Sequence, residues 1–186
     1  MKSLLNNVII AKGDITSFDV EAIVNAANTS LLGGGGVDGA IHKAAGPELL
    51  EECISLKGCE SGKAKITKAY RLKAKYIIHT PGPVYKNGRC GERALLESSY
   101  NNCMSLAKEY NVSSIAFPAI STGIYSYPKE EACKIALKTV LAFVDKEKYF
   151  PTIYFVLYDD ANFLIYKNEF EKVKNELQTV SEQLLQ

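Results

Sequence analysis

Short apolar runs that alternate with helical patterns constrain the fold of this chain most. Five runs are rich in β-branched and aromatic residues, and each ends at a turn residue or a proline: Val8–Ala11, Ala22–Val24, Tyr76–Ile78, Ile115–Phe117 and Ile153–Tyr158. Runs of this length and composition are typical of buried strands. A sixth segment, residues 65–70, alternates polar and apolar residues, which indicates a strand with one solvated face.

Helical periodicity fills the intervals between these runs. The spacing of apolar residues predicts helices over about 38–45, 47–56, 92–110, 129–146 and 162–177. Strands that alternate with helices indicate an α/β domain with helices on both faces of a mostly parallel or mixed sheet. Because the 186 residues contain no linker and no repeat, we expect one domain over 1–178 and a helix end or tail over 179–186.

Composition and charge argue against several classes of protein. The 22 Lys and Arg nearly balance the 21 Asp and Glu, so we expect no strong nucleic-acid binding. No apolar run approaches the ~20 residues that span a bilayer, and the N-terminal run is too short for a signal sequence. The five Cys are scattered without a CxxC pair, and there are only two His. This pattern argues against a zinc site and indicates reduced thiols in a cytoplasmic compartment.

The segment between Asn25 and Gly39 carries the strongest functional signal. It joins a predicted strand to a predicted helix and contains four successive glycines, Gly33–Gly36. Consecutive glycines cost conformational entropy, and they suit a backbone that approaches a ligand closely or points N–H groups at an anion. The N-terminus of the following helix adds a partial positive charge. The alternative interpretation is a mobile surface loop.

Polar side chains in and after this loop are candidates for chemistry. Asp38 lies where the glycines meet the helix, so it suits an N-cap and also a group that orients a water beside a bound phosphate, and the two roles are compatible. His42 follows four residues later and can share a helix face with Asp38, although a lone His on a helix is more often structural. Asn25 and Asn28 suit turns, and their amides also suit hydrogen bonds to sugar hydroxyls.

The loop also contains the dinucleotide-binding pattern GxGxxG, in Gly34, Gly36 and Gly39. That fingerprint requires its first glycine directly after the strand, and here eight residues separate Gly34 from Asn25. No clear strand-ending acid follows about 20 residues later. We therefore reject a Rossmann dehydrogenase.

Other loops after predicted strands offer ligand contacts at the same edge of the sheet, where ligands bind in open α/β sheets. Residues 121–125 follow a strand with hydroxyls and a glycine, which suits a second phosphate cradle, but the chain has no P-loop GK[ST]. Two cradles suggest a ligand with two linked phosphates. Asp14 could accept a hydrogen bond from an amino group such as that of adenine, and Tyr158 could stack on a base. The alternatives are ordinary turns and, for Tyr158, a core position.

Four stretches of the chain carry a family resemblance: Gly13–Thr16, Ile23–Asn28, Gly33–His42 and Pro118–Tyr125. They resemble the macrodomain family, with the closest match to its MacroD-type branch, and the resemblance extends to about residue 160. It implies a three-layer α/β/α sandwich around a mixed, roughly six-stranded sheet. It also implies an ADP-ribose pocket at the carboxyl ends of the strands.

The resemblance further implies a role for each candidate residue. Asp14 and Ile15 would bind adenine, and Tyr158 would pack on its ring. The diphosphate would lie between the glycine loop and the second cradle, in contact with Gly35, Gly36, Val37, Ser121, Thr122, Gly123, Ile124 and Tyr125. Asn28 and Asp38 would lie at the distal ribose, with His42 supporting that region.

MacroD-type enzymes remove mono-ADP-ribose from acidic side chains and deacetylate O-acetyl-ADP-ribose, and both substrates are esters of the distal ribose. The resemblance implies hydrolysis by a water that Asp38 positions or partly deprotonates. It implies no cofactor and no metal, and a monomer is the simplest expectation. The expected partners are ADP-ribose, its esters and mono-ADP-ribosylated proteins.

Three alternatives remain open at this point. The chain could be a reader that binds ADP-ribose without turnover, or a hydrolase of another ester such as ADP-ribose-1''-phosphate. It could also be an RNA- or poly(ADP-ribose)-binding module, against which the net charge of +1 argues. The combination of Asp38 and Asn28 within a complete glycine loop favours an enzyme.

Overall fold

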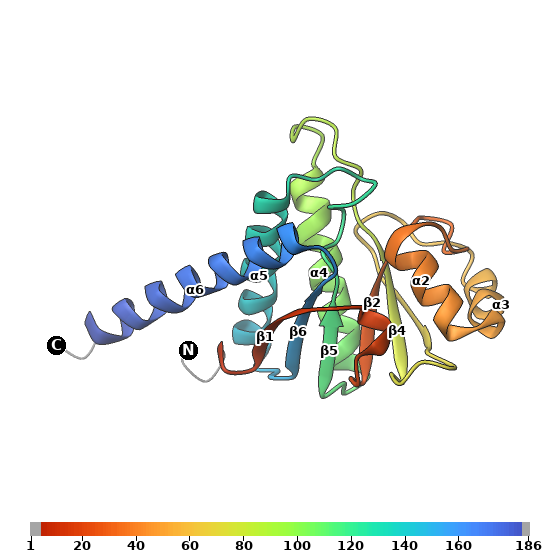
Figure 1. The fold of residues 1–186 in the computed structure, drawn as a ribbon, viewed down its shortest axis with the longest axis horizontal. Helices are drawn as coiled ribbons and strands as arrows, with labels where there is room; N and C mark the ends of the chain where they lie inside the picture. The colour runs from red at the N-terminus through yellow and green to blue at the C-terminus, as the bar shows by residue number, and fades with distance from the viewer. Residues whose placement is uncertain (1–4, 184–186) are drawn as a thin grey trace.

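A mixed six-stranded sheet forms the middle layer of the structure (Figure 1), a computed structural model that describes residues 5–183. Its strands are β1 (Val8–Lys12), β2 (Ala22–Ala27), β3 (Lys65–Lys68), β4 (Tyr76–Pro81), β5 (Ser114–Phe117) and β6 (Thr152–Leu157). They lie in the order β1-β6-β5-β2-β4-β3, and every pair is parallel except β3 with β4. The carboxyl ends of the five parallel strands therefore meet at one edge of the sheet.

Helices cover both faces of this sheet (Figure 1). One face carries α4 (Glu92–Glu109), α5 (Lys129–Glu147) and the core-facing part of α6 (Asp160–Gln183). The other face carries the 3₁₀ helix η1 (Ile15–Ser17), α2 (Gly36–Ala45) and α3 (Pro47–Ser55). Each face buries its own apolar cluster against the sheet, and burial of this kind is the main stabilising contribution to such a sandwich. The predicted three-layer α/β/α fold is confirmed.

The predicted elements agree with the observed ones in type and order, with differences at their ends. β2 and β4 continue by three residues beyond the apolar runs, because the parallel pairing between them extends to Ala27 and Pro81. β6 ends at Leu157, so Tyr158 lies outside the strand. α2 begins at Gly36 rather than near Asp38, and α6 reaches Gln183. The helix therefore extends into the predicted tail at 179–186, of which residues 184–186 lie outside the described residues.

Within residues 5–183, no helix combines the length and the apolar character that crossing a bilayer requires.

Glu21 ties three strands together at the edge of the sheet opposite their carboxyl ends. Its carboxylate accepts hydrogen bonds from the amide and hydroxyl of Ser113, before β5, and pairs with Lys75, before β4, at 2.5 Å. Its own amide donates to the hydroxyl of Ser114 at 2.9 Å. These contacts, led by the one to Lys75, lower the pKa of Glu21 from 4.5 to about 2.

We expect Glu21→Gln to lower the free energy of unfolding by about 1 kcal/mol at pH 7, because an exposed ion pair contributes little and the hydrogen bonds to Ser113 are partly kept. Since the folded pKa lies below the unfolded value, this stabilisation is complete above about pH 4.5 and is lost as the pH falls toward 2. Urea unfolding of both proteins between pH 7 and pH 3 measures the difference. A difference that stays constant over this range contradicts the assignment.

Candidate functional site

A cavity of about 590 Å³ opens at the edge of the sheet where the parallel strands end. Loops that follow all five parallel strands contribute to its lining. The lining residues that the sequence singled out are Asp14, Ile15, Asn28, Gly35, Gly36, Val37, Asp38, Ser121, Thr122, Gly123, Ile124, Tyr125 and Tyr158. Fifteen sequence-predicted site residues thus divide into these thirteen at the cavity and two, Asn25 and His42, behind its wall.

The glycine loop leads directly into α2. Gly35 is the N-cap residue and Gly36 is the first helical residue, so Asp38 lies within the first turn. The alternative in which Asp38 is the N-cap is therefore wrong. Close packing explains Gly39, because a Cβ there would lie 2.4 Å from the carbonyl oxygen of Gly34. Gly36, Val37 and Asp38, whose amides begin the helix without intrahelical partners, line the cavity.

Asp38 is a buried carboxylate with one oxygen held and one oxygen free. The residue is 3% exposed, and its Oδ1 accepts a hydrogen bond of 2.7 Å from Nδ2 of Asn25. Among the described residues, its Oδ2 has no hydrogen-bond partner. Burial raises the pKa of Asp38, while the bond from Asn25 and the charge of His42 oppose this shift. A buried acceptor without a protein partner is one that an ordered water can satisfy where the site has room for it.

Asn25 and His42 support Asp38 from behind. Asn25 is fully buried in β2 and is absent from the cavity lining, so the predicted hydrogen bond to a sugar hydroxyl is not supported by this geometry. Its amide bonds Asp38 and the ring of His79 instead. His42 lies on α2 with its Nε2 3.5 Å from Oδ1 of Asp38. Both residues therefore contact Asp38 rather than the cavity.

Asn28 shapes the glycine loop at the cavity. Its Nδ2 donates to the carbonyl of Gly33 at 2.8 Å, and its Oδ1 accepts from the amide of Ser30 at 3.0 Å. One N–H of the amide remains for a ligand. A Cβ at Gly34 would lie 3.2 Å from Nδ2 of Asn28 and 3.1 Å from Oδ2 of Asp38. A glycine at this position leaves the two side chains a shared approach to the cavity.

The second loop, residues 121–125, faces the glycine loop across the cavity. Ser121 is buried with φ of +66°, an uncommon conformation for a residue with a side chain. Among the described residues, the amides of Gly123, Ile124 and Tyr125 make no hydrogen bond. Ile124 is 80% exposed, and its Cδ1 would lie 3.5 Å from a Cβ at Gly35. The two loops thus approach each other and offer N–H groups from both sides to an anion.

Asp14 and Tyr158 lie in the loops after the neighbouring strands β1 and β6. Asp14 caps η1, because its Oδ1 accepts hydrogen bonds from the amide and hydroxyl of Thr16 at 2.9 and 2.7 Å. No described residue bonds its Oδ2. Tyr158 is 82% exposed, so the alternative of a core position is wrong. An exposed ring in a cavity wall is available for stacking.

Two further polar residues, Asn162 at the cavity and His79 behind it, were not among the predicted site residues. Asn162 of α6 lines the cavity, where its Nδ2 donates to Oδ2 of Asp159 at 2.7 Å and to Oγ1 of Thr122 at 3.3 Å. Asp159, three positions before Asn162, is a typical N-cap residue, and this signal could have indicated the contact between the two side chains. His79 follows the apolar run of β4, and its register opposite Asn25 gave no signal before the strands were paired.

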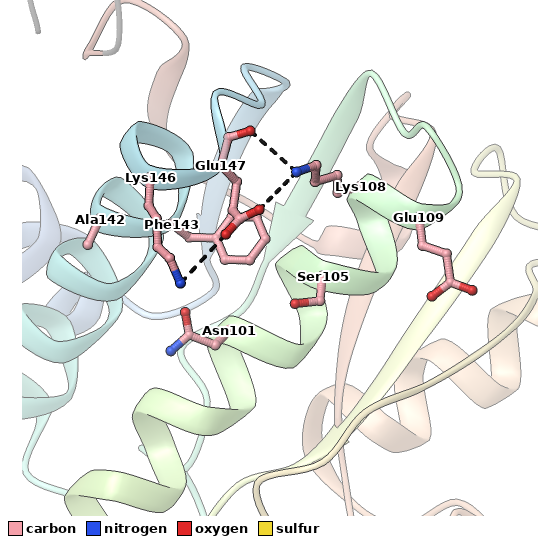
Figure 2. A pocket seen from close by; sticks show the side chains of 8 residues that line it. All are labelled: Asn101, Ser105, Lys108, Glu109, Ala142, Phe143, Lys146 and Glu147. Carbon is pink, nitrogen blue, oxygen red and sulfur yellow. Dashed lines mark hydrogen bonds and ion pairs between the residues drawn. The ribbon is translucent and has the colours of Figure 1, made fainter.

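A second cavity, of about 700 Å³, lies between α4 and α5 (Figure 2). Its walls carry Asn101, Ser105, Lys108, Glu109, Ala142, Phe143, Lys146 and Glu147. Lys108 pairs with Glu147 at 2.9 Å and also donates to its carbonyl, so these charges already have partners. None of the sequence-predicted residues lies there. The cavity at the carboxyl ends of the strands is therefore the candidate site.

A three-layer sandwich with two amide-lined loops at this edge defines an α/β domain built to bind an anionic, phosphate-type ligand. The Macro domain family model matches residues 24–136. The chain is 50% identical to the O-acetyl-ADP-ribose deacetylase of Salmonella newport over 161 residues, 84% of this chain and 90% of that protein. It is 52% identical to the ADP-ribose glycohydrolase MACROD2 of Xenopus laevis over 173 residues, 90% of this chain and 41% of that protein.

The solved Trypanosoma brucei macrodomain in complex with ADP-ribose superposes with a TM-score of 0.84 at 38% identity, covering 89% of this chain and 70% of that one. The chain belongs to the Macro domain family. The family resemblance drawn from the sequence is confirmed, and the matched residues include both the glycine loop and the second loop.

We expect Gly39→Ala to destabilise the protein by about 1 kcal/mol or more, because the clash with the Gly34 carbonyl outweighs the gain of about 1 kcal/mol in helix propensity. Gly123→Ala is the matched control, since nothing lies within 4 Å of its Cβ position. We expect this control to change stability by less than about 0.5 kcal/mol. Thermal unfolding compares the two variants, and equal midpoints would contradict the close packing of loop and helix.

Proposed function

We propose that this chain is an ADP-ribose-binding hydrolase that removes mono-ADP-ribose from acidic side chains of proteins, deacetylates O-acetyl-ADP-ribose, or does both. The observation that carries the proposal is the unpartnered Oδ2 of Asp38, buried in the wall of a cavity that two amide-lined loops enclose. The names of two relatives, an ADP-ribose glycohydrolase and an O-acetyl-ADP-ribose deacetylase, support it.

In this proposal the ligand spans the cavity from one end of the candidate site to the other. The adenine lies at Asp14 and Ile15, with Tyr158 packed on its ring. The diphosphate lies between Gly35–Val37 and the loop of residues 121–125, where backbone N–H groups and the N-terminus of α2 favour negative charge. The macrodomain that binds ADP-ribose in Trypanosoma brucei supports this choice of ligand.

The distal ribose then reaches Asn28 and Asp38. The ester between the ribose and an acyl group is hydrolysed by a water that Oδ2 of Asp38 holds. The water gives its hydroxyl to one fragment and a proton to the other, which releases ADP-ribose and a free carboxylic acid. Because burial raises the pKa of Asp38, the carboxylate is a better proton acceptor than an exposed one. Asn28 uses its remaining N–H to hold a ribose hydroxyl.

We expect Asp38→Asn to lower kcat by about 10²–10⁴-fold, the range of general acid–base assistance, because the variant keeps the shape but loses the proton acceptor. The Asn side chain can still accept from Asn25, so the fold and ADP-ribose affinity are retained. The assay measures release of ADP-ribose from a protein modified on Glu, and of acetate from O-acetyl-ADP-ribose. Calorimetry measures ADP-ribose binding on the same samples.

The outcomes of this experiment separate the candidate functions. Turnover by the original protein and its loss in Asp38→Asn, with binding retained in both, supports the proposal. Binding without turnover of either ester makes the chain a reader, and turnover of ADP-ribose-1''-phosphate alone makes it a hydrolase of a different ester. Full activity of Asp38→Asn removes Asp38 from the mechanism.

We expect Asp14→Asn to weaken ADP-ribose binding by about ten- to a hundredfold, since a hydrogen bond to a charged group contributes about 1.5–3 kcal/mol. The Asn oxygen keeps the cap on Thr16, so η1 remains in place while an NH₂ group replaces the acceptor offered to adenine. Calorimetric titration with ADP-ribose tests this expectation, and Thr16→Val serves as the control for loss of the Thr16 hydroxyl bond to Asp14 alone. Unchanged affinity of Asp14→Asn would contradict the adenine assignment.

A further inference from the structure

A chain of buried polar side chains runs from β3 through β4 and β2 to Asp38. Oγ1 of Thr67 lies 2.9 Å from Nε2 of His79, and Nδ1 of His79 lies 3.1 Å from Nδ2 of Asn25. Nδ2 of Asn25 lies in turn 2.7 Å from Oδ1 of Asp38. The parallel register of β2 and β4 pairs Asn25 with His79, which puts the two side chains beside each other. Thr67, His79 and Asn25 are at most 2% exposed.

The direction of every hydrogen bond between these side chains follows from Thr67, where the series begins. The hydroxyl of Thr67 donates its single proton to the carbonyl of Lys68 at 3.1 Å, so it accepts from Nε2–H of His79. His79 therefore presents a bare Nδ1, which accepts from one N–H of Asn25. The second N–H of the same amide donates to Asp38. The orientation of the Asn25 amide is thus fixed from the His79 side.

The surroundings keep this arrangement in a single protonation state. Burial lowers the pKa of His79 to about 3, so its ring stays neutral in ordinary buffers. Cys53 of α3, whose Sγ lies 3.9 Å from Nε2 of His79, has a pKa raised to about 11 by burial. The titratable groups around Asp38 are His42 on its own helix, Cys53 on α3 and His79 on β4.

We propose that His79 is a positioning residue for Asp38: as the Nε2–H tautomer held by Thr67, it fixes the Asn25 amide so that Oδ1 of Asp38 is bonded and Oδ2 is left for the water. This inference rests on the proposed function, because it assigns the residues that make Asp38 competent.

The opposite tautomer shows why the arrangement matters. A proton on Nδ1 of His79 would pair with Oδ1 of Asn25, which has no partner among the described residues. The amide would then be flipped, and its carbonyl oxygen would face the carboxylate of Asp38. Two acceptors in contact raise the pKa of the carboxyl and remove its anchor. The hydroxyl of Thr67 prevents this state by accepting from Nε2.

Two variants at residue 79 separate positioning from packing. His79→Asn places an acceptor near the position of Nδ1, toward Asn25, whereas His79→Gln places its amide near Nε2, toward Thr67. We expect His79→Gln to lower kcat by about tenfold or more, in line with a weakened hydrogen bond to a charged group, with ADP-ribose affinity unchanged. We expect His79→Asn to recover most of kcat, although both variants remove the ring and leave similar space.

Thr67→Val and Thr67→Ser give a second, independent pair if residue 79 does not tolerate substitution. Valine keeps the shape of threonine but cannot accept from Nε2–H, and serine keeps the hydroxyl. We expect Thr67→Val to lower kcat with unchanged affinity, and Thr67→Ser to retain kcat. In the slow variants the acid limb of the kcat profile moves to higher pH, because Asp38 loses the bond from Asn25 that lowers its pKa.

A spectroscopic measurement tests the inference without reference to activity. The ¹³C shift of the Asp38 carboxyl, followed by NMR against pH, gives its pKa in each variant. A higher Asp38 pKa in His79→Gln than in His79→Asn, and in Thr67→Val than in Thr67→Ser, supports the positioning role. If this result is obtained but no ester is hydrolysed, the proposed function is contradicted and the positioning role is not. An unchanged pKa and pH profile, or equal losses of kcat within both pairs, overturns the inference.

Discussion

The hydrogen bond between Asn25 and Asp38 connects the sheet to the site. It joins the carboxyl end of β2 to the first turn of α2, across the glycine loop. A buried carboxylate without such a bond would be costly, and it would lower that cost by taking up a proton. With one oxygen bonded and the other free, Asp38 is stable enough to stay in the wall of the cavity and polar enough to hold a water.

The two loops around the cavity show where the protein gives up stability for ligand contact. Ser121 adopts a left-handed conformation, and the amides of residues 123–125 are left without protein partners. Strain of this kind persists only where neighbouring structure fixes the backbone. Here Tyr127 donates to the carbonyl of Ser121, and Tyr85 donates to the carbonyl of Tyr125, which anchors the second loop at both ends. The unpaired N–H groups that remain are the ones an anion would satisfy.

The fold could be predicted from sequence because its signals are local. Apolar runs mark the strands, periodicity marks the helices, and the alternation of the two determines the layers. The loops of the site could be predicted too, because glycines and polar residues follow the strands directly. The start of α2 could not, since Gly35 takes the N-cap place that Asp38 suits equally well by residue type. The contact of His79 with Asn25 could not be predicted for another reason. It depends on strand register, which brings together residues 54 positions apart.

The proposed function therefore assigns binding and turnover to different parts of this molecule. The ligand cradle consists mainly of backbone N–H groups, which many sequences can supply once glycines allow the loops to close. In the proposed mechanism, turnover requires one carboxylate oxygen to stay unpartnered while the other is bonded, and that condition extends inward through Asn25 and His79 to Thr67. A chain could keep the whole cradle and lose only this inner series of hydrogen bonds, and it would then bind the same ligand without hydrolysing it. The difference between a reader and a hydrolase on this fold is thus expected in the buried layer behind the cavity rather than at its surface.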